Sequence, residues 1–139
     1  MSRGRALATI VRGVELDGDG YVRLRALLEE QFAAALRHDA AALGELAAHV
    51  TALVAEIDAR RIEREAICAT LAGQGARIPA ILPLLPALSR QAFTAAWSAL
   101  EAQVVECKRL NARNGRLLTE QHALMQRLLR GDADTYAPA

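Results

Sequence analysis

Apolar residues recur every three or four positions along almost the whole chain, and almost nowhere do they alternate with polar residues at a period of two. A spacing of about 3.5 residues places the apolar side chains on one face of a helix, so it predicts helices and no strands. Aromatic residues make up only 4% of the sequence, although 53% of its positions are hydrophobic. The predicted fold is therefore all-α, an antiparallel three-helix bundle with coiled-coil-like packing and a core of aliphatic residues.

The length of 139 residues suits one domain with a real core. We expect a single helical domain over residues 1–139. Its expected segments are an N-terminal segment (1–18), a first helix (19–38), a second helix (39–72), a Pro-rich connector (73–88), a long third helix (89–130) and a flexible tail (131–139).

The expected start of the first helix is set by Asp17-Gly18-Asp19-Gly20, in which either aspartate can act as N-cap. This segment is similar to the beginning of a calcium-binding loop, but the later ligands and the final glutamate are missing, which favours turn and capping chemistry. His38-Asp39 predicts a tight corner, because Asp39 can cap the second helix and the apolar pattern changes there.

The inner faces of the first two helices follow from the same spacing. The inner positions of the first are Leu24, Leu27, Leu28, Gln31, Ala35 and Leu36, and those of the second are Leu43, Leu46, Val50, Leu53 and Ile57. The pattern of the second helix weakens at Arg60, Arg61 and Arg64, and it resumes at Ile67 and Leu71. Gly73 and Gly75 predict the end of that helix.

Three prolines, Pro79, Pro83 and Pro86, disfavour a long helix in the next segment. The segment is nevertheless apolar, so we expect it to fold back against one end of the bundle and to contain at most a short helical turn. A lid on the bundle is the favoured interpretation, and a partner-binding surface is the alternative.

The third helix is expected to begin at a Ser89 cap and to end at Gly131. Its predicted seam, with alternating steps of four and three, is Leu100, Val104, Cys107, Asn111, Asn114, Leu118, Gln121, Met125 and Leu128. Leu110, Leu117, Leu124 and Leu129 flank this seam and widen the apolar face beyond what one narrow seam needs. The three amides in the seam either set the register between helices or contact a partner.

Two further features of this helix need an explanation. Gly115 in mid-helix costs about 1 kcal/mol relative to alanine, which predicts a close helix approach or a bend. A band of basic residues consists of Lys108, Arg109, Arg113, Arg116, Arg127 and Arg130. A solvated face is the favoured interpretation of this band, because no aromatic or glycine-rich element for binding phosphate accompanies it.

The sequence offers little catalytic chemistry. His38, His49 and His122 stand in unrelated contexts, and no known nucleophile, nucleotide or metalloprotease motif occurs. Cys68 and Cys107 are far apart and have no neighbouring ligands, so we expect free thiols and no metal. The protein is thus not expected to be an enzyme or to hold a cofactor.

The charge and the amino terminus exclude further classes. The net charge of +1 requires no nucleic-acid partner. The apolar stretch 6–11 is too short for a signal sequence or a membrane span. We therefore expect a cytoplasmic protein with no membrane insertion.

Several segments together resemble a known family. The most specific is Leu110-Asn111-Ala112-Arg113-Asn114-Gly115-Arg116-Leu117-Leu118, an LNxxNGxLL pattern late in a long helix. Weaker matches are Leu27-Leu28-Glu29-Glu30-Gln31, His38-Asp39, Trp97 and Thr135-Tyr136. Spread thinly over nearly the whole chain, they resemble the FlgN family of flagellar type III export chaperones.

The resemblance implies a cytoplasmic chaperone that binds the C-terminal region of hook-associated proteins, the subunits of the hook–filament junction, before export. It implies that the last helix contacts the client and that a tyrosine in the tail docks on the cytoplasmic domain of the export-gate membrane protein; the export ATPase complex is a further candidate partner. Carried over, the client-binding residues are Leu110, Asn111, Asn114, Leu117, Leu118, Gln121, Leu124, Met125 and Leu128, and the docking residue is Tyr136. The family often continues past this tyrosine toward a glycine, whereas here Ala137-Pro138-Ala139 follows.

Two other functions remain open from the sequence. The first is a structural or adaptor bundle that forms a homodimer through the third helix. The second is a helical protein that associates with nucleic acid through the basic band, with binding that depends steeply on salt.

Overall fold

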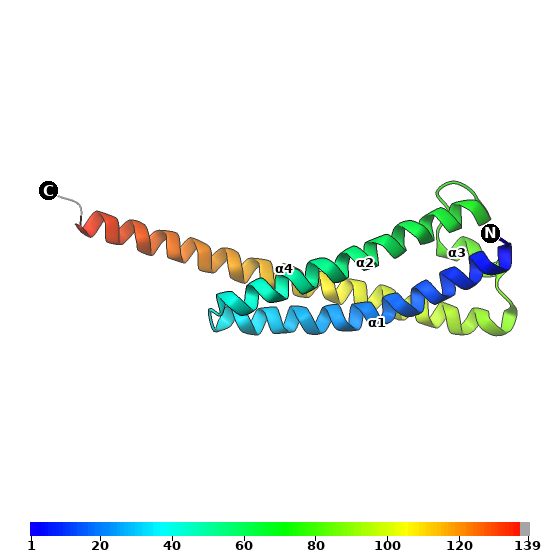
Figure 1. The fold of residues 1–139 in the computed structure, drawn as a ribbon, viewed down its shortest axis with the longest axis horizontal. Coiled ribbons are helices and arrows are strands. Elements are labelled where there is room, and N and C mark those ends of the chain that lie inside the picture. The colour runs from blue at the N-terminus through cyan, green and yellow to red at the C-terminus, as the bar shows by residue number, and fades with distance from the viewer. Residues whose placement is uncertain (137–139) are drawn as a thin grey trace.

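The computed structural model describes the backbone of residues 1–136 and the side chains of residues 1–130. Within residues 1–136 the chain forms helices and no strand, which confirms the prediction of an all-α fold. The elements are α1 (Arg3–Leu36), α2 (Ala40–Ala72), the short α3 (Ile78–Ile81), the 3-10 turn η1 (Leu82–Leu84) and the long α4 (Ala87–Tyr136). In Figure 1, α1 and α4 run in the same direction and α2 runs against both.

The long helices do not contribute equally to the packing. α1 packs against both α2 and α4. In the part of the chain that the structure describes, no Cα atom of α2 comes within 8 Å of a Cα atom of α4. The arrangement is therefore more open than a bundle in which every pair of helices packs closely, and α1 is the helix that contacts both of the others.

The first helix begins sixteen positions earlier than expected, at Arg3 rather than at residue 19. The hydroxyl of Ser2 accepts a hydrogen bond of 3.2 Å from the main-chain N–H of Arg5 and so caps the helix. The helical spacing continues upstream through the buried Leu7, Ile10 and Val14. The prediction of a separate N-terminal segment over residues 1–18 is therefore wrong, because this apolar stripe outweighs the intervening glycines.

The expected turn at Asp17-Gly18-Asp19-Gly20 is also absent, and these residues lie inside α1. Asp17 is fully buried and accepts hydrogen bonds from Arg60 and Arg64 of α2. At Gly20, a β-carbon would lie 3.4 Å from the side chain of Ile57, so the missing side chain lets α2 approach closely. Tertiary contacts with α2 thus replace the predicted capping role of this segment.

The corner at His38-Asp39 is confirmed. α1 ends at Leu36, His38 has a positive φ of 56°, and α2 begins at Ala40. The Asp39 carboxylate caps α2 by accepting a hydrogen bond of 3.0 Å from the main-chain N–H of Ala42. Leu53 and Ile57 are buried as predicted, and Leu43, Leu46 and Val50 are half-buried.

The segment between α2 and α4 starts with Gly73 and Gly75, whose φ values of 100° and 79° suit glycine. α3 and η1 follow, and Ile78, Ile81 and Leu85 are buried in the adjacent core. The guanidinium of Arg90 in α4 donates to the carbonyl oxygens of Leu82 and Leu85, both at 3.0 Å.

Both ends of α4 differ from the prediction. The helix begins at Ala87, directly after Pro86, instead of at a Ser89 cap. It also continues through Gly131 to Tyr136. One glycine costs a helix about 1 kcal/mol, which is too little to end it where the next proline is Pro138. The prediction that the helix ends at Gly131 is therefore wrong.

The core consists of two clusters along α1. The first lies at the end that holds α3 and includes Leu7, Ile10, Val14, Ile67, Cys68, Ile81, Phe93 and Leu100. The second lies toward the α1–α2 corner and includes Leu24, Leu27, Leu28, Leu53, Ile57, Cys107 and Leu110. α4 is thus held along α1 as far as the corner, and it then extends alone (Figure 1).

Candidate partner-binding helix

α4 is fixed to α1 by hydrogen bonds that repeat at a constant sequence distance. Asn114 donates to the carbonyl oxygen of Leu28 at 2.8 Å and Gln121 donates to that of Ala35 at 2.9 Å, each across 86 residues. The thiol of Cys107 lies 3.7 Å from the carbonyl oxygen of Tyr21, with the same separation of 86. Positions 107, 114 and 121 are one heptad apart, so α1 and α4 pair like the strands of a parallel coiled coil.

Asn114 has all of its polar atoms satisfied although it is only 1% exposed. Its amide nitrogen donates to the carbonyl oxygen of Leu28 and to the side-chain oxygen of Gln31, both at 2.8 Å. Its amide oxygen accepts from the guanidinium of Arg113 at 3.1 and 3.2 Å. A fully bonded buried amide favours one alignment of the helices, which supports the interpretation of this residue as a register setter.

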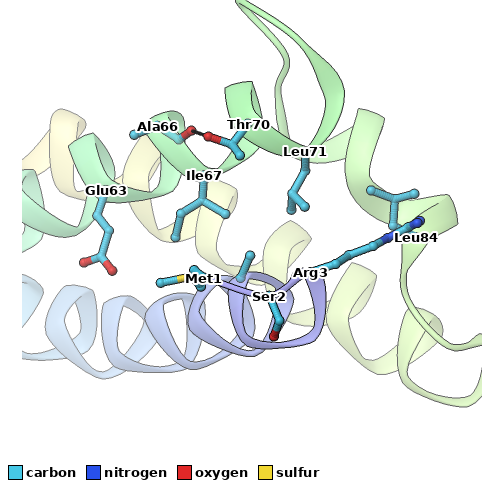
Figure 2. A pocket seen from close by; sticks show the side chains of 10 residues that line it. Met1, Ser2, Arg3, Glu63, Ala66, Ile67, Thr70, Leu71 and Leu84 are labelled. Carbon is cyan, nitrogen blue, oxygen red and sulfur yellow. Dashed lines mark hydrogen bonds between the residues drawn. The ribbon is translucent and has the colours of Figure 1, made fainter.

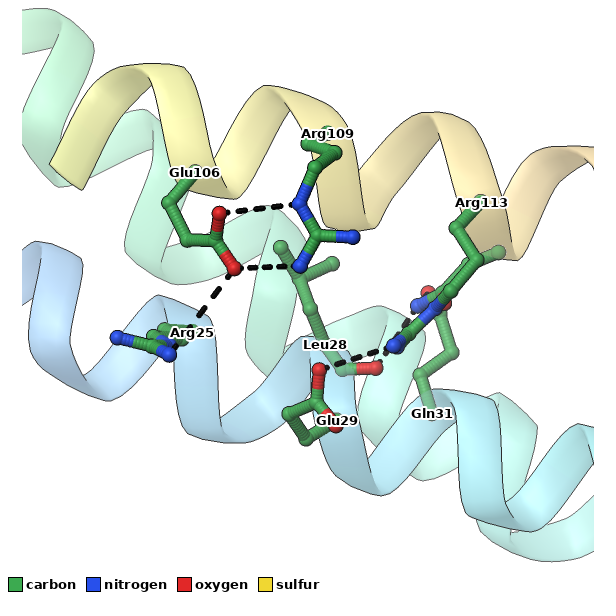
Figure 3. A network of polar contacts seen from close by, with 8 residues as sticks. Arg25, Leu28, Glu29, Gln31, Glu106, Arg109 and Arg113 are labelled. Carbon is green, nitrogen blue, oxygen red and sulfur yellow. Dashed lines mark hydrogen bonds and ion pairs between the residues drawn. The ribbon is translucent and has the colours of Figure 1, made fainter. Parts of the chain in front are cut away.

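Charged side chains line one flank of the same seam (Figure 3). Arg113 lies 3.1 Å from the Glu29 carboxylate, and its guanidinium stacks 3.8 Å from the ring centre of Phe32. Glu106 pairs with Arg109 at 2.6 Å and reaches Arg25 of α1 at 4.0 Å. The hydrogen bonds from Arg109 are the main cause that lowers the pKa of Glu106.

Beyond Gln121, α4 has no helix beside it, and residues 122–130 are all exposed. Four large apolar residues lie there and are about half exposed: Leu124 at 50%, Met125 at 54%, Leu128 at 56% and Leu129 at 57%. We call these four residues the projecting stripe. Leu124 and Leu128 continue the heptad positions that face α1 upstream, since Leu128 follows Gln121 by seven residues and Leu124 follows Leu117 by seven.

The structure divides the predicted client-binding residues into two groups. Leu110 and Asn114 are buried against α1, and Leu117 and Gln121 are half-buried. Asn111, Leu118, Leu124, Met125 and Leu128 are exposed. The predicted seam is therefore wrong at Asn111 and Leu118, whose inner places are taken by Leu110 and Leu117. The backbone of Tyr136 belongs to α4, and its side chain lies outside the described residues.

Gly115 has no close neighbour: nothing lies within 4 Å of the place where a β-carbon would be. Of the two explanations predicted from the sequence, the close helix approach is therefore wrong, and a bend of the helix stays a prediction.

Sequence reasoning missed an ionic cluster that joins all three long helices. Arg60 and Arg64 of α2 both bind the buried Asp17 carboxylate of α1, and Arg64 does so at 2.8 Å. The Arg64 guanidinium also lies 5.4 Å from the ring centre of Trp97 on α4. Burial is the main cause that raises the pKa of Tyr21, and the nearby Asp17 carboxylate raises it further. The signal in the sequence was the pair of arginines that interrupts the apolar stripe of α2.

A cavity of about 620 Å³ opens between the first turn of α1 and the C-terminal part of α2 (Figure 2). Ile67 and Leu71 point from α2 toward α1, and Met1 lies between the helices. Glu63 is the one carboxylate and Arg3 the one cationic side chain among the residues that line it. This lining suits the burial of an apolar side chain, and none of the predicted site residues contributes to it.

The potentially reactive side chains do not gather in one place. Cys68 belongs to the first core cluster and Cys107 to the second, and burial raises the pKa of both thiols. Over residues 1–130, no group of three or more histidine, cysteine, aspartate or glutamate side chains is placed to hold a metal ion.

α2 is also notable for its composition. It contains an 18-residue stretch with a mean hydropathy of 1.4, which by length and composition alone would suffice for a membrane span. A single stretch of this kind is weak evidence for a span, and only 11% of it is buried in the structure.

A helix that carries exposed leucines beyond its own core is typical of proteins that hold a partner. The chain matches the family described as FlgN protein over residues 1–131. It is a member of the FlgN family, and this membership suggests a role as a flagellar export chaperone. No curated protein and no solved structure matches the chain.

Proposed function

We propose that this protein is a cytoplasmic export chaperone that binds the C-terminal region of flagellar hook-associated proteins and delivers them to the type III export gate. The observation that carries the proposal is the projecting stripe at the free end of α4. Exposing four large apolar side chains to water on consecutive helical turns is unfavourable for a monomer. A client helix bound there would cover them.

The energetics of this surface suit reversible holding. Burying the exposed half of a leucine contributes about 1 kcal/mol, so the projecting stripe supplies several kcal/mol before the entropy of association is subtracted. Such an interface can keep a client soluble and still release it at the export gate.

We assign client contact first to the exposed Leu118, Leu124, Met125 and Leu128, together with Asn111. Leu110, Asn114, Leu117 and Gln121 hold α4 on α1 in this conformation. They would reach a client only if α4 separated from α1.

We further propose that Tyr136 docks the loaded chaperone on the cytoplasmic domain of the export-gate membrane protein, with the export ATPase complex as a second candidate partner. Tyr136→Ala is then expected to weaken binding to that domain and to leave client binding unchanged. A calorimetric titration in which both partners bind the variant like the parent protein would remove the docking role.

The central experiment titrates the C-terminal segment of a hook–filament junction protein into the chaperone. Leu128→Asp is expected to weaken binding at least tenfold, because it puts a charge into the apolar interface. Leu88→Asp is the matched control, since Leu88 is 98% exposed at the opposite end of α4. Equal affinity of both variants and the parent protein for the client segment would refute the proposal.

A homodimer through α4 is the main alternative, because two projecting stripes could cover each other. The mass of the protein in solution, measured with and without client, separates the two. A stable dimer that persists when the client segment is added would favour the adaptor role.

A role in binding nucleic acid is less well supported by the contacts of the basic band. Arg109 pairs with Glu106, and Arg113 pairs with Glu29, so two of its members are already neutralised. If the protein bound DNA or RNA with an affinity that falls steeply with salt, the nucleic-acid role would be favoured instead.

A further inference from the structure

The packing of α1 on α4 shows which kind of helix the α4 seam accepts. Facing α4, α1 presents aliphatic residues and main-chain carbonyl groups at heptad spacing, as Leu28 and Ala35 do. At the flank it presents residues that match the charge on α4. α1 therefore serves as a template for any helix that binds the remaining length of the seam.

Each of two charged residues on the flank of α4 lies near an opposite charge on α1, although the two pairs span 81 and 84 residues and so do not repeat at one register. Each flank residue of α4 directly precedes a seam residue: Glu106 precedes Cys107, and Arg113 precedes Asn114. Glu106 reaches Arg25 of α1, and Arg113 contacts both the Glu29 carboxylate and the ring of Phe32. Charges at such flanking positions influence partner choice and orientation in parallel coiled coils, and Arg25 and Phe32 occupy one of these positions on α1.

α1 ends at Leu36, but the flank of α4 continues. The next residues in the same heptad position are Glu120 and then Arg127, which directly precedes Leu128 of the projecting stripe. Arg127 takes part in none of the ion pairs found among residues 1–130.

The charges beside the projecting stripe are mostly positive over residues 116–130, and Asp132 and Asp134 follow them in the sequence. Between residues 116 and 130, three arginines (Arg116, Arg127 and Arg130) stand against one carboxylate (Glu120), which gives 3 − 1 = +2 with His122 neutral. A second copy of this chain would bring the same positive charge to the interface. An acidic flank on the partner is therefore the better complement.

We infer that the projecting stripe binds an amphipathic helix that lies in line with α1 and carries an acidic residue beside its apolar stripe, opposite Arg127. The inference rests on the proposed function and specifies the chemistry of the client segment. Arg127 then has the role toward the client that Arg113 has toward Glu29 of α1.

Two synthetic helical peptides test this. They share one apolar heptad stripe and differ only in the flanking positions, which are glutamate in one peptide and lysine in the other. We expect the glutamate peptide to bind the full chain roughly fivefold more tightly at low salt, and the preference to shrink as salt is added.

Variants of the protein show which residue causes the preference for the glutamate peptide. Arg127→Glu is expected to abolish or reverse the preference between the two peptides. Arg130→Glu makes the same change of charge three residues on, at a position turned away from the stripe, and should leave most of the preference intact. Leu128→Asp should weaken the binding of both peptides.

Equal binding of the two peptides, tighter binding of the lysine peptide, or binding of neither would overturn the inference. The proposed function is judged separately by the hook-associated segment. If that segment binds and loses affinity with Leu128→Asp, the chaperone role stands even when the peptides show no preference for acid.

Discussion

The side-chain amide of Asn114 donates a hydrogen bond of 2.8 Å to the main-chain carbonyl oxygen of Leu28, which lies 86 residues earlier in the chain. Gln121 repeats the contact one heptad later on Ala35. Because both bonds span the same number of residues, a slip of α4 by one position along α1 would break both at once. The alignment of the two helices is therefore fixed by polar groups, while the leucines between them supply most of the apolar area.

Asn114→Ala is expected to lower the free energy of unfolding by about 2 kcal/mol, since it leaves the side-chain oxygen of Gln31 without its donor, removes one acceptor of Arg113 and opens a small cavity. Asn111→Ala removes the same group from an exposed position of the same motif and should change stability by less than about 0.5 kcal/mol. Urea unfolding followed by circular dichroism measures both. Equal losses would show that Asn114 does not hold the register.

Asp17→Asn is expected to destabilise the protein by about 3 kcal/mol or more, because two arginines lose the buried carboxylate that neutralises them. Asp19→Asn is the control, since Asp19 is exposed two residues away. The emission of Trp97, the single tryptophan, should change as well, because Arg64 lies over its ring. A parent-like unfolding curve for Asp17→Asn would contradict this account of the cluster.

The cap at Asp39 predicts a dependence on pH. The hydrogen bond from the Ala42 N–H lowers the pKa of Asp39 below its ordinary value of 3.8. Since the pKa is lower in the folded state, the stabilisation is complete above about pH 5 and is lost as the pH falls through the folded pKa. Asn also caps helices but does not titrate, so the stability advantage of the parent protein over Asp39→Asn should shrink between pH 5 and pH 3. A constant difference over that range would exclude the carboxylate as the source.

His38→Gly is expected to raise the free energy of unfolding by up to about 1 kcal/mol, because His38 has a φ of 56° that glycine adopts without strain. The same substitution inside α2, His49→Gly, should lower it by about 1 kcal/mol. Thermal unfolding of the two variants would then shift in opposite directions. A loss of stability in both would mean that the ring of His38 matters more than its backbone.

The two thiols should react slowly in the folded protein. Burial raises the pKa of Cys68 and of Cys107, so little thiolate is present near pH 8. Thiol titration is expected to proceed far more slowly in the native state than in denaturant, where two thiols per chain should react. A fast native reaction of one thiol would reveal local opening of its core cluster.

The helical class could be predicted because the apolar spacing is regular, and the corner could be predicted because Asp39 offers both a cap and a change of pattern. The start of α1 could not, since Asp17-Gly18-Asp19-Gly20 has the local composition of a turn. Only the arginines of α2, brought close by folding, make a helix through Asp17 favourable. Local preference was overruled there by a contact across 43 residues.

The candidate site shows the same limit. Spacing alone marks α4 as the helix with too much apolar surface, and that part of the prediction agrees with the exposed Leu124, Met125 and Leu128. It cannot decide between two neighbouring stripes, such as Leu110 with Leu117 and Asn111 with Leu118. That choice depends on how α1 is rotated against α4, which the amide contacts of Asn114 determine.

The length of α1 determines how much of α4 is covered within the molecule. Leu36 ends α1, and the next full turn of α4 after Gln121 is the first that has no neighbour. If two heptads were added to the end of α1, the longer α1 would cover Leu124 and Leu128 and would compete with a client helix for them. If one heptad were removed, Gln121 would become exposed. How much of α4 is offered to another protein is thus decided by where a different helix stops, so an insertion or deletion near residue 36 should retune affinity without altering any residue of the contact surface.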